Sequence, residues 1–238
     1  MQLLETDRLL LRPFTPDDAE GLYAYASHPE VGPPAGWRPH RSVEESRQVI
    51  ENIFIPSDAL AVLRKSDGRL IGSAGFVDRH RTELGTPSEE IGYSLARDCW
   101  GQGLIPEAVE AILRHAFAEL STGLNELDAD LQKGIYATSP AMLTSLCTQI
   151  FGKAMSAQMA LGELPYGSIE LEQTAAFLAK TGDYAAALSR SAAVNGGCTE
   201  EEREGLRGLS AAASALSAQV AALQSDLWAG AATLEDVE

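Results

Sequence analysis

The chain of 238 residues contains few of the residues that build disulfide frameworks or metal centres. Its three cysteines, Cys99, Cys147 and Cys198, are widely separated and include no CxxC pair, so we expect neither a disulfide framework nor a zinc site. The four histidines also lack the spacing of metal ligands, and we therefore expect no metal. An odd number of separated cysteines is typical of a reducing compartment, so we expect a cytoplasmic protein.

Basic residues and long apolar runs are scarce as well. The sequence holds 18 Lys and Arg against 34 Asp and Glu, a formal net charge of −16, and both halves are acidic. This balance argues against a nucleic-acid surface, which needs clustered basic side chains. No run approaches the roughly 18 apolar residues of a transmembrane helix, and the N-terminus has no charged leader followed by an apolar core. We therefore expect no nucleic-acid partner and no membrane segment.

The composition changes near the middle of the chain. Valine and isoleucine are concentrated in residues 1–120, whereas alanine is concentrated in residues 121–238. β-Branched residues favour strands and alanine favours helices. We therefore expect strands with some helices in the first half and helices alone in the second.

The stretch from 90 to 120 predicts a strand, a turn and a helix. Ile91, Tyr93 and Leu95 alternate with smaller or polar residues, which is the period of a half-buried strand. Gly101 and Gly103 follow, and because glycine has no Cβ atom they allow backbone conformations that other residues avoid. A run of apolar residues at spacings of three and four follows, which gives a helix one apolar face; it comprises Val109, Ile112, Leu113, Ala116, Phe117 and Leu120.

The junction of this turn and helix is a candidate anion site. Pro106 suits a first helical turn, where its missing N–H group costs nothing. Free N–H groups and the helix dipole at such a position favour a phosphate. From the spacing alone, a tight turn without any ligand is an equally good explanation.

The rest of the first half alternates strands with helices. Leucines at positions 3–11 predict one strand that ends at Pro13, and Thr15 is expected to cap the helix that follows. Residues 28–39 form a proline-rich loop, and Ser42 with Glu45 predicts a capped helix over 42–54. Two further strands, 59–64 and 70–77, flank an Asp-Gly pair that is typical of a hairpin.

The second half has helical period throughout. Ser139 and Pro140 predict the start of a helix that extends to Leu161, and another is expected over 170–192. The last helix has a capping box of Thr199 and Glu202 and regular spacing over three heptads; its apolar positions are Leu206, Leu209, Ala213, Leu216, Val220, Leu223 and Leu227.

Two separated stretches of the first half resemble the GNAT acetyltransferases, in particular the branch that acetylates ribosomal-protein N-termini and related amines. WGQGLIPEAVEAILRHAFAEL resembles the acyl-CoA-binding segment, and ETDRLLLRPFTPDDAEGLYAYASHPEV resembles the first strand and helix of that branch. The resemblance covers about residues 1–120. It implies acetyl-CoA as the co-substrate, no metal, and a small-molecule or peptide amine as the acceptor.

The resemblance also implies which residues hold acetyl-CoA. Backbone groups near Leu95 would hold the pantetheine arm, and the amides of the turn would hold the pyrophosphate. The implied cofactor-binding residues are Leu95, Trp100, Gly101, Gln102, Gly103, Leu104 and Ile105. Trp100 stands where the family usually has a basic or amide residue, which removes a charged contact but leaves the backbone amides in place.

Three further residues are candidates for the chemistry. Glu90, at the start of the central strand, stands where family members often place a base that works through water, although a solvated glutamate at a strand end explains it equally well. Trp37 and Arg38 lie in the loop that borders the acceptor cleft in the family, although a tryptophan packed over the core is commoner. The family's leaving-group acid comes from beyond the next strand, and this sequence has no such strand.

The second half resembles a different family. LQKGIYATSPAMLTSL, LEQTAAFLAKTGDYAAALSR and TEEEREGLRGLSAAASAL resemble the helical region of YpeB, a spore germination protein that partners a cortex-lytic enzyme. The join is expected near residues 123–125. A genuine fusion and an artefact of sequence assembly both agree with the sequence.

We therefore expect an α+β chain of two domains. Residues 1–122 form a partial GNAT acyl-CoA-binding domain, an incomplete mixed sheet with flanking helices. Residues 123–238 form an all-α bundle, YpeB-like, with one long heptad helix and a protein partner. The expected function is acetyl transfer to a primary amine, impaired by the missing half of the fold. The alternative is a non-enzymatic, YpeB-like partner of a cortex-lytic enzyme.

Overall fold

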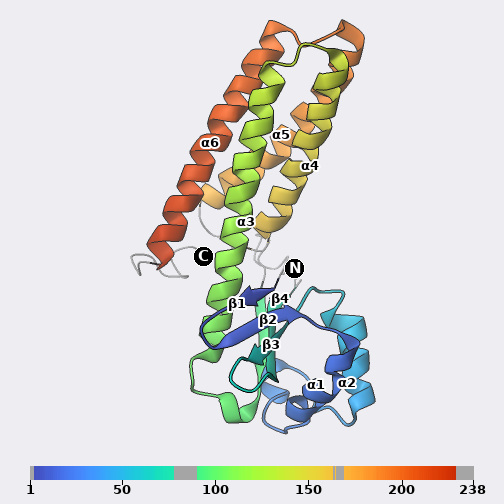
Figure 1. Cartoon of the computed structure of the whole chain (residues 1–238), viewed down its shortest axis with the longest axis vertical. Coiled ribbons are helices and arrows are strands. Elements are labelled where there is room, and N and C mark those ends of the chain that lie inside the picture. The colour runs from blue at the N-terminus through green and yellow to red at the C-terminus, as the bar shows by residue number, and fades with distance from the viewer. Residues whose placement is uncertain (1–2, 78–89, 163, 165–168, 229–238) are drawn as a thin grey trace. The chain divides into compact units, whose positions relative to one another are not determined.

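The structure, a computed structural model, describes residues 3–77, 90–162, 164 and 169–228. The chain divides into two compact units, Met1–His115 and Ala116–Glu238. The first unit holds a sheet with short helices, and the second is made of helices alone (Figure 1). The expected α+β class is confirmed.

The sheet of the first unit has five strands in the order β1-β2-β3-β4-β5, and every described pairing is antiparallel. The strands are β1 (Leu4–Glu5), β2 (Leu9–Pro13), β3 (Leu60–Arg64), β4 (Arg69–Val77) and β5 (Glu90–Leu95). The hairpin expected around Asp67 and Gly68 joins β3 to β4, and Gly68 has a φ of +67°. Because β5 ends the sheet order, only one of its edges is paired among the described strands.

The prediction of a single strand at the N-terminus is wrong. The chain turns between β1 and β2, and the two pair with each other. Thr6 makes this turn because its N–H group donates to the Leu9 carbonyl at 3.0 Å and its Oγ1 accepts from the Leu9 N–H at 2.9 Å. Threonine hydroxyls offer the backbone such local partners in competition with strand pairing.

Two helices that lie wholly in the first unit pack on its sheet, and the start of a third, α3 (Leu104–Ile135), joins the same core through Leu104, Ala108 and Ile112. After a short 3₁₀ turn (Pro16–Asp18), α1 spans Ala19–Ala26, and α2 spans Val43–Val49 before it continues as a π-helical segment, Ile50–Phe54. The cap expected at Ser42 is present, since its Oγ accepts from the Glu45 N–H at 3.1 Å. Thr15 is the N-cap residue of the 3₁₀ turn, and its backbone N–H donates to the Asp18 carboxylate at 2.8 Å. Apolar side chains from the strands and both helices form one buried core, and its members include Leu9, Leu11, Leu22, Ile50, Leu60 and Ile71.

The described helices of the second unit run side by side (Figure 1). They are α3 (Leu104–Ile135), of which the residues from Ala116 onward belong to this unit, α4 (Pro140–Gly162), α5 (Ile169–Asn195) and α6 (Glu200–Trp228). All the helices expected here are confirmed, as are the caps of α4 and α6, in which Ser139 and Thr199 accept backbone N–H groups at 3.2 Å. The join expected at 123–125 falls inside the unbroken helix α3, so the boundary at 122 stays a prediction.

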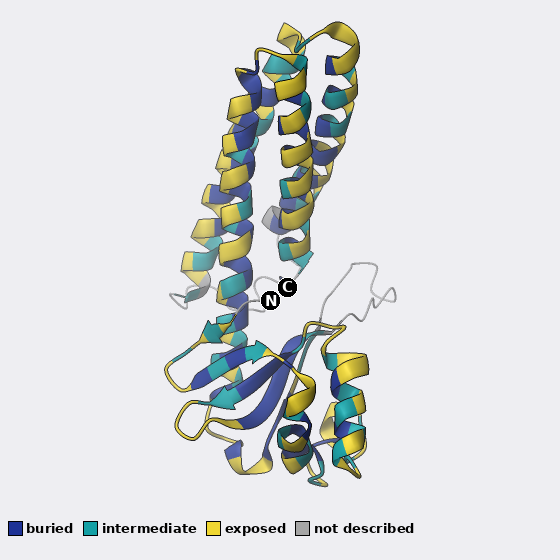
Figure 2. Ribbon diagram, turned by 45° about the vertical axis from the view of Figure 1, so that its right-hand side comes forward, coloured by how far each residue is buried: buried dark blue, intermediate teal, exposed yellow. Residues whose placement is uncertain are grey.

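The bundle buries one face of each helix (Figure 2). Gly123 allows α3 and α4 to approach closely, because a Cβ atom there would lie 3.2 Å from the Ala157 Cβ. Polar pairs join α3 to α6, among them Ser217 to Asn125 at 2.8 Å. No described helix is both long and apolar enough to span a bilayer.

One carboxylate is buried inside this bundle. Asp130 of α3 is 1% exposed and makes ion pairs with Lys133 at 2.7 Å and with Lys153 of α4 at 2.9 Å. Burial alone would raise the pKa of Asp130, but the hydrogen bonds and charges of the two lysines lower it overall. Asp130 is therefore ionised in the folded protein at neutral pH.

Candidate active site

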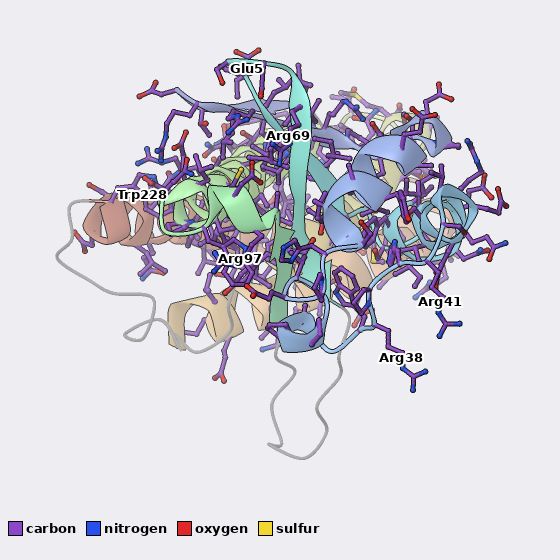
Figure 3. All side chains as sticks on the ribbon, turned by 90° about the horizontal axis from the view of Figure 1, so that it is seen from below. Glu5, Arg38, Arg41, Arg69, Arg97 and Trp228 are labelled. Carbon is purple, nitrogen blue, oxygen red and sulfur yellow. The ribbon has the colours of Figure 1, made fainter. Side chains whose placement is uncertain are left out.

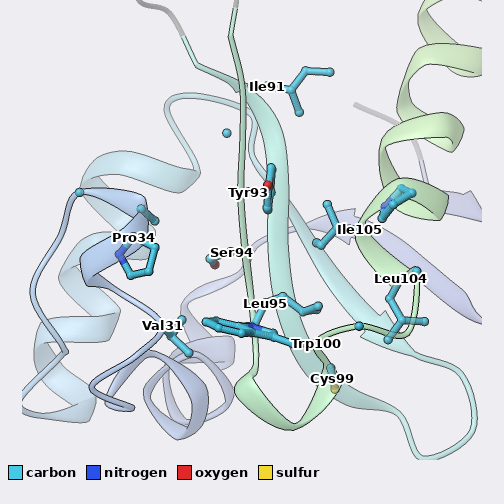
Figure 4. A pocket seen from close by; sticks show the side chains of 16 residues that line it. Val31, Pro34, Ile91, Tyr93, Ser94, Leu95, Cys99, Trp100, Leu104 and Ile105 are labelled. Carbon is cyan, nitrogen blue, oxygen red and sulfur yellow. The ribbon is translucent and has the colours of Figure 1, made fainter. Parts of the chain in front are cut away.

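A cavity of the first unit lies along β5 and the turn by which β5 leads into α3 (Figure 4). Its volume is about 720 Å³. Three segments supply its walls: the loop after α1, strand β5, and the turn that begins α3. The lining residues are Val31, Pro34, Ala35, Gly36, Ile91, Gly92, Tyr93, Ser94, Leu95, Cys99, Trp100, Gly101, Gly103, Leu104, Ile105 and Pro106.

The turn between β5 and α3 has the geometry that its glycines predict. A 3₁₀ turn (Arg97–Cys99) precedes Gly101 and Gly103, whose φ angles are +73° and +71°, and α3 then begins at Leu104. Positive φ values of this size favour glycine. Within the described part of the chain, the N–H groups of residues 101–105 donate to no protein acceptor. A helix start with several unused N–H groups is suited to an anion.

Arg8, which is not among the lining residues, binds this turn. Its Nη1 donates to the Gln102 carbonyl at 2.9 Å and its Nη2 donates to the Gly103 carbonyl at 3.2 Å. Glu107, in the first turn of α3, accepts from Arg8 Nε at 2.6 Å and from the Arg8 backbone N–H at 3.1 Å. No local pattern in the sequence indicates the roles of these two residues, because they are 99 positions apart.

Trp100 closes one end of the cavity (Figure 4). Its Nε1 donates to the Leu95 carbonyl at 2.8 Å, so the Leu95 carbonyl already has a protein partner. The guanidinium of Arg97 lies 4.6 Å from the centre of the Trp100 ring, a cation–π contact, and Arg97 also forms an ion pair with Glu30. These contacts fix the indole beside the turn.

A cluster of three hydroxyl groups supports the wall of the cavity at Ser94. Ser94 Oγ lies 2.8 Å from Ser73 Oγ and 3.1 Å from the hydroxyl of Tyr25, and Ser73 and Ser94 are direct partners across β4 and β5. Burial raises the pKa of Tyr25 to about 12, so its hydroxyl stays protonated at physiological pH. Tyr25 is 69 residues from Ser94, and no local pattern in the sequence indicates the cluster.

The structure brings most of the expected cofactor-binding residues together. Leu95, Trp100, Gly101, Gly103, Leu104 and Ile105 all line the cavity. Gln102 does not line it, because its side chain donates to the Asp98 carbonyl at 2.9 Å and its own carbonyl faces Arg8. Glu90 is the first residue of β5, and its side chain lies outside the part of the chain that the structure describes.

The two expected acceptor-binding residues are not among those that line the cavity. Trp37 is half-buried, packs against the core of the first unit and contacts His40, with ring centres 5.1 Å apart and ring planes tilted by 52°. Arg38 is exposed and extends outward (Figure 3). From the same loop, smaller residues such as Val31 and Pro34 face the cavity instead. Among the described residues, no group of three or more His, Cys, Asp or Glu side chains could hold a metal ion.

Comparison with known proteins places both halves of the chain. Residues 8–138 match the family model of the GNAT acetyltransferase domain, and residues 106–236 match the model of the YpeB N-terminal region. The two matches therefore share residues 106–138, which correspond largely to α3.

Two curated proteins resemble the chain. The uncharacterized N-acetyltransferase p20 of Bacillus licheniformis is 31% identical over 171 residues, which is 69% of this chain and 92% of that protein. The uncharacterized N-acetyltransferase YoaA of Bacillus subtilis is 30% identical over 135 residues, or 53% of this chain and 72% of that protein.

Solved structures of acetyltransferases are also similar. A GNAT-family acetyltransferase from Bacillus anthracis superposes with a TM-score of 0.40 at 23% identity, covering 50% of this chain and 68% of that one. The ribosomal-protein-S5-alanine acetyltransferase from Vibrio fischeri gives a TM-score of 0.39 at 20% identity, with 51% and 70% covered. From the family models and the curated relatives, the chain belongs to the GNAT acetyltransferase family, with a YpeB N-terminal domain formed by its C-terminal helices.

Proposed function

We propose that the first unit binds acetyl-CoA in the cavity beside β5 and transfers the acetyl group to a primary amine at a trace rate. The observation that carries this proposal is the run of unused N–H groups at residues 101–105, of which all but Gln102 line the cavity at the start of α3. These groups fit a pyrophosphate, because the helix dipole and the unused N–H groups at the start of a helix favour negative charge there. A cytoplasmic location agrees with the three free cysteines.

Different residues of the cavity would bind different parts of acetyl-CoA and of the acceptor. The amides of Gly101 to Ile105 would hold the pyrophosphate, and the glycines leave room because a Cβ atom at Gly101 would meet nothing within 4 Å. The unpaired edge of β5 would hold the pantetheine arm through backbone groups. Acetyl-CoA supplies the activated acyl group. Glu90 would accept the proton of the attacking amine through water, and Trp37 and Arg38 would contact the acceptor at the outer end of the loop.

The expected rate of acetyl transfer is low because a single strand of the sheet, β5, borders the cofactor cleft. GNAT enzymes form the cofactor cleft between two splayed strands, whereas β5 is the last described strand of this sheet. A general acid for the leaving thiolate contributes typically 10²- to 10⁴-fold, and loss of orientation costs more, since effective molarities reach about 10⁵ M or higher. None of the residues that we assign supplies this acid.

A calorimetric titration with coenzyme A and a thiol-release assay test the proposal. We expect binding at micromolar to millimolar coenzyme A, and slow thiol release with peptides that begin with alanine or serine, reduced further by Glu90→Gln. No binding at millimolar coenzyme A would overturn the cofactor assignment. Turnover near 1 s⁻¹ or above, within the usual range for enzymes, would overturn the claim of impairment.

The second candidate function is a non-enzymatic, YpeB-like partner of a cortex-lytic enzyme. The match of residues 106–236 to the YpeB N-terminal model favours it. A stripe of exposed apolar side chains on α4, formed by Phe151, Met155 and Met159 at spacings of four, provides an apolar face. Retention of a purified cortex-lytic hydrolase by the immobilised chain, abolished by Met155→Glu with Met159→Glu, would support this function. If the hydrolase is not retained, this second candidate function is disproved.

A further inference from the structure

We propose that Arg8 is a positioning residue for the phosphate-binding amides: it holds two carbonyls of the turn outward so that the Gly103 and Leu104 N–H groups face the cavity. The inference rests on the proposed acetyl-CoA site and assigns the residue that gives this site its shape. Arg8 lies in the turn before β2, far from the glycine turn in the sequence.

The contacts of Arg8 reach two consecutive peptide groups. Its Nη1 binds the Gln102 carbonyl and its Nη2 binds the Gly103 carbonyl, at 2.9 and 3.2 Å. A guanidinium presents its N–H groups in a rigid planar fork, so these two bonds restrain both carbonyls together. The Gly103 carbonyl also accepts from the Glu107 N–H group at 3.4 Å, whereas the Gln102 carbonyl is held by Arg8. An ammonium group has no such fork.

The directions of the carbonyls determine those of the amides. In a trans peptide the C=O group of one residue and the N–H group of the next point in opposite directions, and no cis peptide is present in the described chain. The Gln102 carbonyl faces Arg8, so the Gly103 N–H points away from Arg8. The Gly103 carbonyl also faces Arg8, so the Leu104 N–H points away as well. Gly103 and Leu104 line the cavity, and Arg8 does not.

The turn needs such a restraint because of its own composition. Glycine at two of three consecutive positions leaves the backbone free to adopt many conformations. Arg8 is itself held in place, since Glu107 accepts from its Nε and its backbone N–H, and Thr6 Oγ1 donates to the same carboxylate. Burial acts to raise the pKa of Glu107, but the bonds from Thr6 and Arg8 lower it overall, so the carboxylate stays ionised. The restraint therefore extends from β2 through Arg8 to the first turn of α3.

The test compares two ligands that differ in the pyrophosphate. Coenzyme A carries it, and pantetheine lacks both it and the nucleotide. The variants of the full chain are Arg8→Met, which removes the fork, and Arg8→Lys, which keeps the charge. Arg47→Met is the matched control, because Arg47 also donates to a backbone carbonyl, that of Pro16 at 2.9 Å, but outside the cavity. We expect both Arg8 variants to bind coenzyme A about ten-fold more weakly, the effect of one lost hydrogen bond to a charged group. Pantetheine binding and the control should be unchanged.

Several results would overturn the proposal. Parent-like coenzyme A affinity in Arg8→Lys would mean that the charge acts on the phosphate directly. An equal loss of pantetheine binding would mean that the substitution disturbs the whole cavity. Amide NMR resonances of the parent provide a measurement that needs no variant: coenzyme A should shift Gly103 and Leu104, and pantetheine should not. If the parent binds no coenzyme A at all, the proposed function fails first, and this inference fails with it.

Discussion

Replacement of Gly103 by valine tests the glycine turn most directly. At φ = +71° any residue with a Cβ atom is strained, by roughly 1–2 kcal/mol. The Cβ atom itself would meet only Arg8 Nη2, at an ordinary 3.8 Å, so the strain lies in the backbone and not in a clash. The branched side chain would stand beside the N–H groups that we assign to the pyrophosphate, and one hydrogen bond to a charged group is worth about 1.5–3 kcal/mol. Coenzyme A should therefore bind about 10- to 100-fold more weakly.

Gly68 provides a control for the backbone strain. It lies in the turn between β3 and β4 at φ = +67°, and a Cβ atom there would meet nothing within 4 Å. Gly68→Val should therefore lower the free energy of unfolding by about as much as Gly103→Val, roughly 1–2 kcal/mol. It should leave coenzyme A affinity unchanged. The pair separates loss of stability from loss of the ligand site.

Calorimetric titration of coenzyme A and denaturant unfolding of both variants supply the comparison. If Gly103→Val binds coenzyme A like the parent, the amides of this turn do not hold the pyrophosphate. If Gly68→Val weakens binding equally, the loss reflects general destabilisation, and our reasoning about the turn is refuted.

Three further predictions concern the helical unit. Residues 116–238 produced alone should give a circular dichroism spectrum dominated by helix, and a disordered spectrum would disprove an independent unit. Lys153→Met should lower the free energy of unfolding of this fragment in urea by less than the about 3–5 kcal/mol typical of a buried charge left without any partner, because Lys133 still pairs with Asp130. The double variant Asp130→Leu with Lys153→Met should recover most of this loss. Failure to recover would show that the two residues do not act as a unit. The pKa of Asp130 is lowered in the folded state, so its stabilising contribution is complete above the unfolded value near 3.8 and is lost as the pH falls through the folded pKa. Asp130→Asn should therefore reduce the decrease in the free energy of unfolding at acid pH. An unchanged decrease would contradict this assignment.

Elements encoded by neighbouring residues could be predicted from the sequence. The glycines before α3, the periodic apolar residues after them and the Thr199 and Glu202 cap each act within about one helical turn, so the pattern alone locates them. The helix caps at Ser42 and Ser139 are likewise predictable, because each involves residues only three positions apart.

Features that depend on distant parts of the chain could not be predicted. Tyr25 reaches Ser94 across 69 residues, and Arg8 reaches Gln102 across 94. The turn at Thr6 was missed because leucines on both sides read as one strand. Which face of the loop after α1 meets the cavity depends on how Trp37 packs against the core, and the sequence does not encode that locally.

The bond between Arg8 and Glu107 also bears on how the first unit folds. It joins residues 99 positions apart, nearly the full length of that unit. Closing a loop of this length costs chain entropy, so we expect this bond to form late in folding. The turn would thus acquire its final shape at the end of folding, after the transition state. A ligand that recognises only the finished turn therefore stabilises the native state without speeding folding, and it extends the lifetime of the protein by slowing unfolding.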